Sequence, residues 1–174
     1  MANYNYTTIG AVLVIILFII GFIGPWYTIS GEFLGVKASI DIGLMKTTFS
    51  GGTGGTNIIS SIDRSEVDTT MYIAIITMVL VIITLIGILG ATFGFGSKST
   101  MQKIGEYCGF LTFIIAIVAI VYYIMNLPDT SDLNALGIES GLGWGFYLFL
   151  IGTILLLLTN FWSRFARAFH AQKN

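Results

Sequence analysis

Four long apolar runs constrain this chain more than any other feature of its sequence. They extend over residues 8–26, 71–95, 104–127 and 142–165. The first two contain no charged residue, the third has Glu106 near its start, and the fourth has Arg164 near its end. About 20 apolar residues in a helix cross a hydrocarbon core of about 30 Å, and a lipid environment requires the backbone to bond to itself. The runs therefore predict an antiparallel bundle of four membrane-spanning helices.

The composition supports a bilayer environment for the whole chain. Of its 174 residues, 55% are hydrophobic and 10% are charged, and the mean hydropathy is +0.88. A soluble domain carries about 25% charged residues, so a soluble core of this size would not hide so much apolar surface. The net charge of −1 gives no reason to expect nucleic acid as a partner. We therefore expect one multi-pass domain of the cell membrane, residues 1–174, in contact with lipid.

The first run is interpreted as a permanent helix rather than a cleaved signal peptide. A signal peptide has a basic segment before its apolar core and small residues at its cleavage site. The segment 1–8 contains no Lys or Arg, and Gly24-Pro25-Trp26 is a poor cleavage site.

Basic residues in the short connections predict the orientation. The connection 96–103 contains Lys98 and Lys103, whereas the charges of the connection 128–141 are all acidic. Because Lys and Arg accumulate on the cytoplasmic side, both termini should be cytoplasmic. The predicted topology is an outer loop at 27–70, a cytoplasmic loop at 96–103, an outer loop at 128–141 and a cytoplasmic tail at 166–174. Four aromatic residues are expected in the outer headgroup zone, namely Trp26, Tyr27, Tyr72 and Trp144.

The first outer loop is too long for a simple connector and is predicted to fold as β-structure. Between Phe33 and Ile42 apolar and polar residues alternate, which is the pattern of a half-buried strand. Further strands are predicted over Trp26–Ser30, Leu44–Phe49 and Asn57–Ile62, with turns at Ser30–Glu32 and Gly51–Gly55. Together they would form a small antiparallel sheet resting on the outer ends of the helices.

Glycines recur in the apolar runs at the spacing of helix contacts. The residues concerned are Gly87, Gly90, Gly94, Gly105, Gly109, Gly141, Gly145 and Gly152. Helices in lipid associate by close backbone approach through small residues. We expect these glycines to pack helices within one bundle in preference to joining copies, because a four-helix chain must first pack itself.

Residues suited to catalysis or metal binding are sparse. Cys108 and His170 are the single cysteine and histidine, and neither belongs to a ligand cluster. Glu106 is interpreted as a helix-end residue within reach of Lys103. The spans lack the buried charges that mark intramembrane chemistry. The sequence therefore predicts no enzyme activity, no cofactor and no metal site.

Two short motifs give the outer loop a resemblance to a known group. Pro25-Trp26 opens the loop and Gly43-Leu44-Met45 follows it. With the four runs, this arrangement resembles the claudin and peripheral-myelin-protein superfamily of four-transmembrane proteins. Met45 stands where that group has the tryptophan of a Gly-Leu-Trp triplet, and the loop has no cysteine, Thr48 occupying the first cysteine position. The resemblance implies a non-enzymatic adhesion, scaffold or assembly protein that works through its outer loops.

Three functions remain open on the sequence. The first is a structural protein that self-associates, or binds membrane-protein partners, through its outer sheet and helix faces. The second is an accessory subunit of a larger membrane enzyme or transport complex. The third, a small transporter or channel, is least favoured because the spans lack coupling groups.

Overall fold

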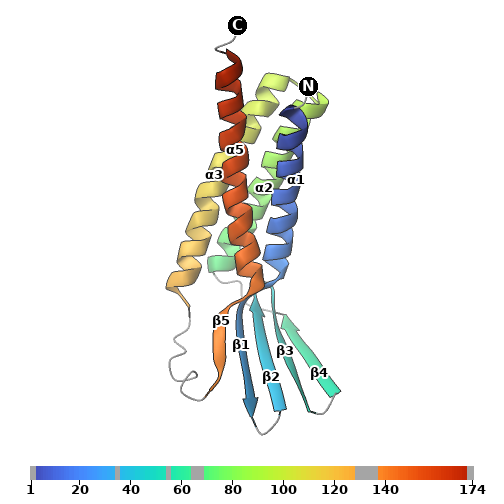
Figure 1. Cartoon of the computed structure of the whole chain (residues 1–174), viewed down its shortest axis with the longest axis vertical. Coiled ribbons are helices and arrows are strands. Elements are labelled where there is room, and N and C mark those ends of the chain that lie inside the picture. Colours follow the sequence, from blue (N-terminus) through green and yellow to red (C-terminus); the bar gives the residue numbers. More distant parts are fainter. Residues whose placement is uncertain (1–2, 34–35, 54–55, 64–68, 128–136, 172–174) are drawn as a thin grey trace.

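The described residues of the chain form four long helices and five strands (Figure 1). The computed structural model describes residues 3–33, 36–53, 56–63, 69–127 and 137–171, and side chains over 9–32, 36–52, 69–127 and 137–159. The helices are α1 (Asn3–Ile23), α2 (Thr69–Phe93), α3 (Lys98–Met125) and α5 (Trp144–Ala171). The strands are β1 (Pro25–Phe33), β2 (Val36–Gly43), β3 (Lys46–Thr53), β4 (Thr56–Asp63) and β5 (Glu139–Leu142). Both termini lie at one end of the bundle and the sheet lies at the other (Figure 1).

Buried small residues explain why the helices pack along their length. The buried residues of α2 include Thr70, Ala74, Thr77, Val81 and Thr84, which alternate spacings of four and three. The same alternation in α3 places Gly105, Gly109, Thr112, Ala116 and Ala119 on one buried face. Such a seam keeps one stripe of a helix against its neighbour over many turns. Accordingly, α2 packs most extensively against α3, and α1 packs most extensively against α5.

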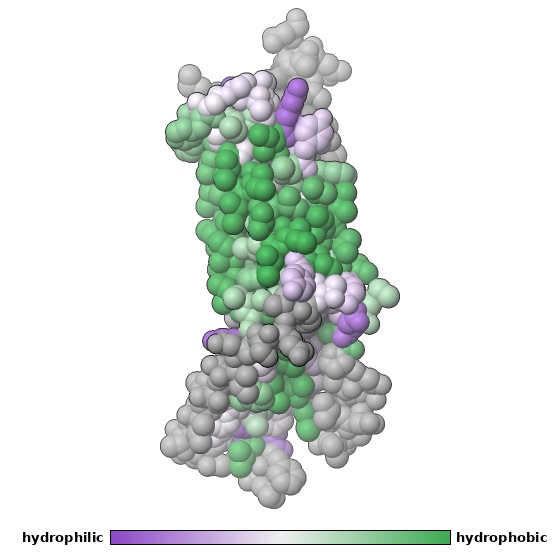
Figure 2. All heavy atoms as spheres, turned by 180° about the vertical axis from the view of Figure 1, so that it is seen from behind, coloured by the Kyte–Doolittle hydropathy of each residue, from purple (hydrophilic) through white to green (hydrophobic). Residues whose placement is uncertain are grey.

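The outward faces of the helices are apolar. Among the described side chains, α2 and α3 are long and apolar enough to cross a membrane, and shorter apolar helical stretches run over Ile9–Ile23 and Trp144–Thr159. Figure 2 shows this surface as a broad hydrophobic band, bounded by hydrophilic residues at the end away from the sheet. A helix that is apolar on its exposed side as well as its buried side suits a lipid environment.

The helix boundaries differ from the predicted spans. The first helix ends at Ile23, and Pro25 and Trp26 already belong to β1. The predicted loop 96–103 is mostly helical, because α3 begins at Lys98. Between α2 and α3 the chain turns through Gly94, whose φ of 79° is the left-handed conformation that favours glycine. The amides of Gly94 and Phe95 both donate to the Gly90 carbonyl, which closes α2.

The sheet has the order β4-β3-β2-β1-β5, and its strand pairs are antiparallel. It lies at the ends of the helices and extends beyond them, with its strands roughly along the bundle axis (Figure 1). The predicted turn at Ser30–Glu32 is wrong, because these residues continue β1 and pair with β2. Of the predicted Gly51–Gly55 turn, residues 51–53 belong to β3 and residues 54–55 lie outside the described residues.

The second outer loop contributes β5, which the sequence analysis did not predict. Its four residues pair with β1, from Tyr27 opposite Leu142 to Ser30 opposite Glu139. Both predicted outer loops therefore contribute strands to one sheet. Residues 128–136 of the second loop lie outside the described residues.

Candidate interaction surface

Trp26 fixes the sheet to the end of the helix bundle. Its side chain is 0% exposed, so it belongs to the core and not to the headgroup zone where the sequence analysis expected it. Its ring meets Tyr123 at a centroid distance of 4.9 Å, Phe149 at 5.1 Å and Phe146 at 5.7 Å. Tilted and edge-on aromatic pairs of this kind add stabilisation beyond area burial. A residue of β1 is thereby held between α3 and α5.

A hydrogen bond from Trp26 compensates for the proline beside it. In a continuous helix the Gly21 carbonyl would accept the amide of residue 25, but Pro25 has no N–H. The Trp26 indole Nε1–H instead donates to the Gly21 oxygen at 2.9 Å. The Pro-Trp pair thus ends α1 and satisfies one of its last carbonyls in the same step.

Glycines allow the backbones around Trp26 to cross closely. A Cβ atom on Gly143 would lie 2.4 Å from the Pro25 oxygen, and one on Gly145 would lie 2.7 Å from the Gly24 oxygen. A Cβ on Gly21 would lie 2.7 Å from the Phe149 nitrogen. The Gly143 amide also donates to the Trp26 carbonyl at 2.9 Å. Any larger residue at these positions would push α1 and α5 apart, because each clash is with backbone.

The two short motifs that carry the resemblance, Pro25-Trp26 and Gly43-Leu44-Met45, lie next to each other in the fold. Gly43 pairs with Pro25 across β1 and β2. Leu44 is 1% exposed and joins the same apolar core as Trp26, whereas Met45 is 49% exposed. Two residues from each motif therefore form the junction between sheet and bundle, and Met45 lies outside it.

The predicted packing glycines fall into two groups. Gly87 and Gly105 meet where α2 crosses α3, since a Cβ on Gly87 would lie 2.5 Å from the Gly105 nitrogen. Gly90 lies against Met101, Gly109 is buried in α3, Gly145 contacts Gly24, and Gly152 lies against Phe18. Contrary to expectation, Gly94 and Gly141 pack against no described helix, because a Cβ on either would meet nothing within 4 Å among the described residues. Gly94 forms the turn after α2, and Gly141 lies in β5.

The sequence analysis missed Gly21, Gly24 and Gly143. In the sequence, their position beside Pro25-Trp26 and Trp144 could have identified them as packing residues, whereas a repeated spacing within one helix could not. A spacing rule finds glycines that share a helix face, whereas these three come from different elements that meet only in the fold.

One face of the sheet is apolar. Residues paired across antiparallel strands share a face, so Ile29, Ile40 and Phe49 lie side by side on β1, β2 and β3. Val36 and Ile42 lie on the same side of β2 by alternation. Phe49 is 37% exposed and Val36 is 39% exposed, so no helix covers them. The predicted alternation is therefore present, but no described element buries its apolar side.

The opposite face is polar. It presents Ser39 and Ser50, whose hydroxyls are hydrogen-bonded to each other, together with Thr28 and Asp41. Near the far end of the same face, Lys37 Nζ lies 4.0 Å from Glu32 Oε2, and both side chains are largely exposed. The sheet is thus amphipathic, with one polar face and one apolar face.

Comparison with known proteins leaves this geometry as the basis for a function. No protein-family model matches the chain, and no curated protein sequence matches it. Within the described residues, no three His, Cys, Asp or Glu side chains are placed to hold a metal ion.

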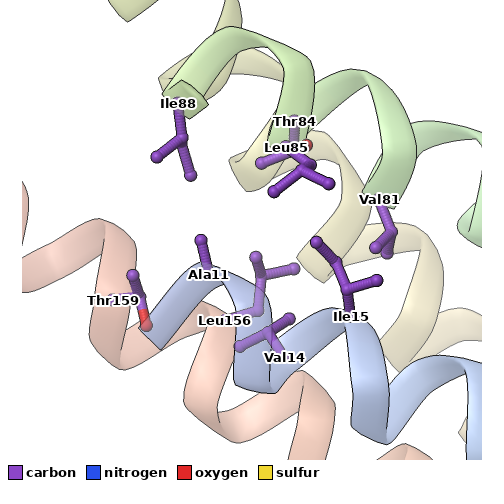
Figure 3. Close-up of a pocket in the computed structure, with 9 residues that line it drawn as sticks. All are labelled: Ala11, Val14, Ile15, Val81, Thr84, Leu85, Ile88, Leu156 and Thr159. Atoms are coloured by element: carbon purple, nitrogen blue, oxygen red, sulfur yellow. The ribbon is translucent and has the colours of Figure 1, made fainter. Parts of the chain in front are cut away.

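A lateral groove between α1, α2 and α5 is the remaining hollow of interest (Figure 3). Its cavity volume is about 10 Å³, about the space of one water molecule, and it is lined largely by aliphatic residues, among them Val14, Leu85 and Leu156. Its two hydroxyls, on Thr84 and Thr159, donate to carbonyls of their own helices.

Proposed function

We propose that this chain is a non-enzymatic, four-pass membrane protein that self-associates or binds partner proteins through its outer sheet and its helix faces. The observation that carries the proposal is the amphipathic sheet, which is held beyond the bundle by Trp26 and leaves Phe49 and Val36 exposed. Exposed apolar patches on a folded protein mark interaction sites.

The arrangement of the ends supports four passes with cytoplasmic termini. The two termini and the Gly94–Lys98 turn share one end of the bundle, and the sheet occupies the other (Figure 1). Lys98 and Lys103 lie at the terminal end, where the positive-inside tendency favours the cytoplasm. In this orientation the sheet lies outside the cell.

The sheet–bundle junction supports a claudin-like organisation. Pro25-Trp26 and Gly43-Leu44, the residues that carry the resemblance, form one buried junction at the base of the sheet. In this proposal they hold the outer sheet at a fixed angle to the membrane. The missing loop cysteines leave that task to the Trp26 contacts.

An accessory subunit of a larger membrane complex is the second candidate. The exposed apolar helix faces favour it, because another membrane helix would cover them.

Crosslinking in native membranes followed by mass spectrometry separates the two candidates. The leading proposal expects crosslinks between copies of the chain, or to non-enzymatic partners, through lysines of the sheet such as Lys37 and Lys46. A stoichiometric enzyme or transporter partner would select the accessory-subunit role. A chain that is strictly monomeric and crosslinks to nothing would refute both.

A single-cysteine series tests the topology. In a Cys108→Ala background, cysteines replacing Glu32 and Ser97 should react from opposite sides of the membrane with an impermeant maleimide. Reaction of both residues from the same side would refute an odd number of passes between them, and with it the proposed orientation of the sheet.

A further inference from the structure

The charged residues of the described helices all lie at one end of the bundle. Helices α1 and α2 contain none, whereas α3 and α5 contain five between them. Counting His170 as neutral, this end has a net charge of +3 from four basic residues and one acidic residue, namely Lys98, Lys103, Arg164, Arg167 and Glu106. The strands at the opposite end contain two basic and four acidic residues, a net charge of −2. The two ends therefore differ in the sign of their charge.

The packing of the helices gives the heights of these residues along the bundle. Ala11, Ile88 and Thr159 line one end of the lateral groove, so α1, α2 and α5 are level there (Figure 3). Gly105 joins the same layer from α3, because its Cβ position is 3.2 Å from the Ile88 nitrogen. A helix rises about 1.5 Å per residue, so a count of residues from this layer gives a height.

The outer aromatic residues position the hydrocarbon core in the proposed membrane placement. Tyr72 precedes the layer by 16 residues in α2, and Trp144 precedes it by 15 residues in α5. Both side chains are more than half exposed, which suits aromatic residues in a headgroup zone. The outer border then lies about 23 Å from the layer, and a core of about 30 Å ends about 7 Å beyond the layer on the other side.

The basic residues lie near this inner border and beyond it. Phe93, which is 66% exposed, and Arg164 both follow the layer by five residues, so each is at the border, about 7.5 Å from the layer. Lys98 and Arg167 are about 10–12 Å from the layer, which is the depth of the headgroups. Lys103 is about 3 Å from the layer, and its long side chain can bring the ammonium group to the border.

Exposed aromatic rings beside the basic residues favour a lipid over a soluble partner. Phe95 is 70% exposed, and its ring lies 6.5 Å from the ring of Phe93. An acidic peptide or a nucleic acid would meet the positive charge but leave these rings in water. A phospholipid meets both, because its acyl chains contact the rings and its phosphate lies among the cations. Figure 2 shows the hydrophilic border of the apolar band at this end.

We propose that this end of the bundle binds anionic phospholipids of the inner leaflet through Lys98 and Lys103, with Arg164 and Arg167 adding positive charge. The inference rests on the proposed membrane placement, and it adds a lipid to the protein partners proposed for the sheet. Lys and Arg form charge-assisted hydrogen bonds to phosphate, and basic clusters beside membrane-spanning helices attract anionic headgroups.

The lipid selectivity of the full-length protein in bilayers tests the inference. Electron paramagnetic resonance of spin-labelled phosphatidylglycerol and phosphatidylcholine, each in phosphatidylcholine bilayers, compares their association with the protein. We expect phosphatidylglycerol to be preferred, and Lys98→Gln or Lys103→Gln should each lower the preference by up to about fivefold. The matched controls are Lys37→Gln and Lys46→Gln, which remove the same charge from the sheet and should leave the preference unchanged. Helix content by circular dichroism confirms folding of each variant.

The wild-type protein provides a second measurement that needs no variant. The preference for phosphatidylglycerol should fall in about 1 M sodium chloride, where the Debye length is about 3 Å. Inorganic phosphate should displace no more spin-labelled phosphatidylglycerol than chloride does at the same ionic strength, because the proposed ligand is a headgroup anchored by its acyl chains.

The outcomes are separate from those that decide the proposed function. A preference that falls in salt and in the α3 variants alone would support the inference. Equal association of the two lipids, equal losses in the α3 and sheet variants, a preference that resists salt, or selective displacement by inorganic phosphate would overturn it. Native-membrane crosslinking decides the interaction function and the single-cysteine series decides the topology, and neither measurement depends on lipid selectivity.

Discussion

Replacing Trp26 with phenylalanine should cost the protein several kcal/mol of stability. The indole N–H donates to the Gly21 carbonyl, and Pro25 leaves that carbonyl without its helical partner. A buried acceptor that loses its donor costs about 1–3 kcal/mol. The smaller ring also leaves a void among aromatic neighbours, which adds about 1 kcal/mol. The expected loss is therefore about 2–4 kcal/mol, the sum of these two terms.

Equilibrium unfolding in mixed micelles measures this loss. Helix content followed by circular dichroism during a titration with dodecyl sulfate gives the free energy of unfolding of each variant. Trp144→Phe is the matched control, because Trp144 is 52% exposed and its replacement should change stability by less than about 0.5 kcal/mol. Equal stabilities of Trp26→Phe and the wild type, or equal losses in the two variants, would refute the role given to the indole bond.

Three further predictions concern packing and charge, and the same unfolding measurement checks each of them. Gly87→Ala should destabilise by about 1–3 kcal/mol, since its Cβ would clash with backbone, whereas Gly141→Ala should cost nothing; equal effects would contradict this account of the helix crossing. Thr84→Val should cost less than about 1 kcal/mol, because the hydroxyl proton already goes to its own helix; a larger loss would reveal an interhelical bond. Glu32→Gln should change stability by less than about 0.5 kcal/mol at any salt concentration, because its ion pair with Lys37 is exposed; a salt-dependent loss would argue otherwise.

The small loss of stability expected for Thr84→Val follows from where the hydroxyl protons of Thr84 and Thr112 go. Thr84 Oγ1 and Thr112 Oγ1 lie 3.4 Å apart between α2 and α3. Each hydroxyl has one proton, and the structure directs them to the carbonyls of Leu80 and Cys108. The two oxygens are therefore in contact without a proton free to join them strongly, so the seam is held by packing.

The helices could be anticipated from sequence because their cause is local. Unbroken apolar runs are compatible with few structures, and only the ends of the helices differ between the prediction and the structure. Pro25 makes α1 end at Ile23, earlier than predicted. After the turn at left-handed Gly94, α3 begins earlier than predicted. These shifts come from single residues, which an average over a whole run does not weigh.

The sheet was only partly predictable because strand pairing is not local. The alternation in Val36–Ile42 indicated β2, but Gly31 suggested a turn where the chain continues straight. Glycine there lies beside Ile138, which directly precedes β5 and comes more than a hundred residues later in the chain. The residues of β5, Glu-Ser-Gly-Leu, have no strand pattern of their own, and their conformation comes from pairing with β1.

The site was the least predictable part. Trp26 resembled an interfacial aromatic in sequence, and its burial depends on Tyr123, Phe146 and Phe149. Which apolar residues lie side by side on the face of the sheet likewise depends on the register between strands. Alternation within one strand does not specify that register.

The pocket of Trp26 also has a consequence for biosynthesis. The tryptophan leaves the ribosome early, whereas Phe146 and Phe149 belong to the last helix. Contacts between residues so distant in sequence form late, because a long loop must close first. In the proposed topology, the sheet should therefore stay unanchored until α5 enters the bilayer. Chains that stall before α5 should expose the sheet to proteases outside the membrane, and completion of α5 should protect it.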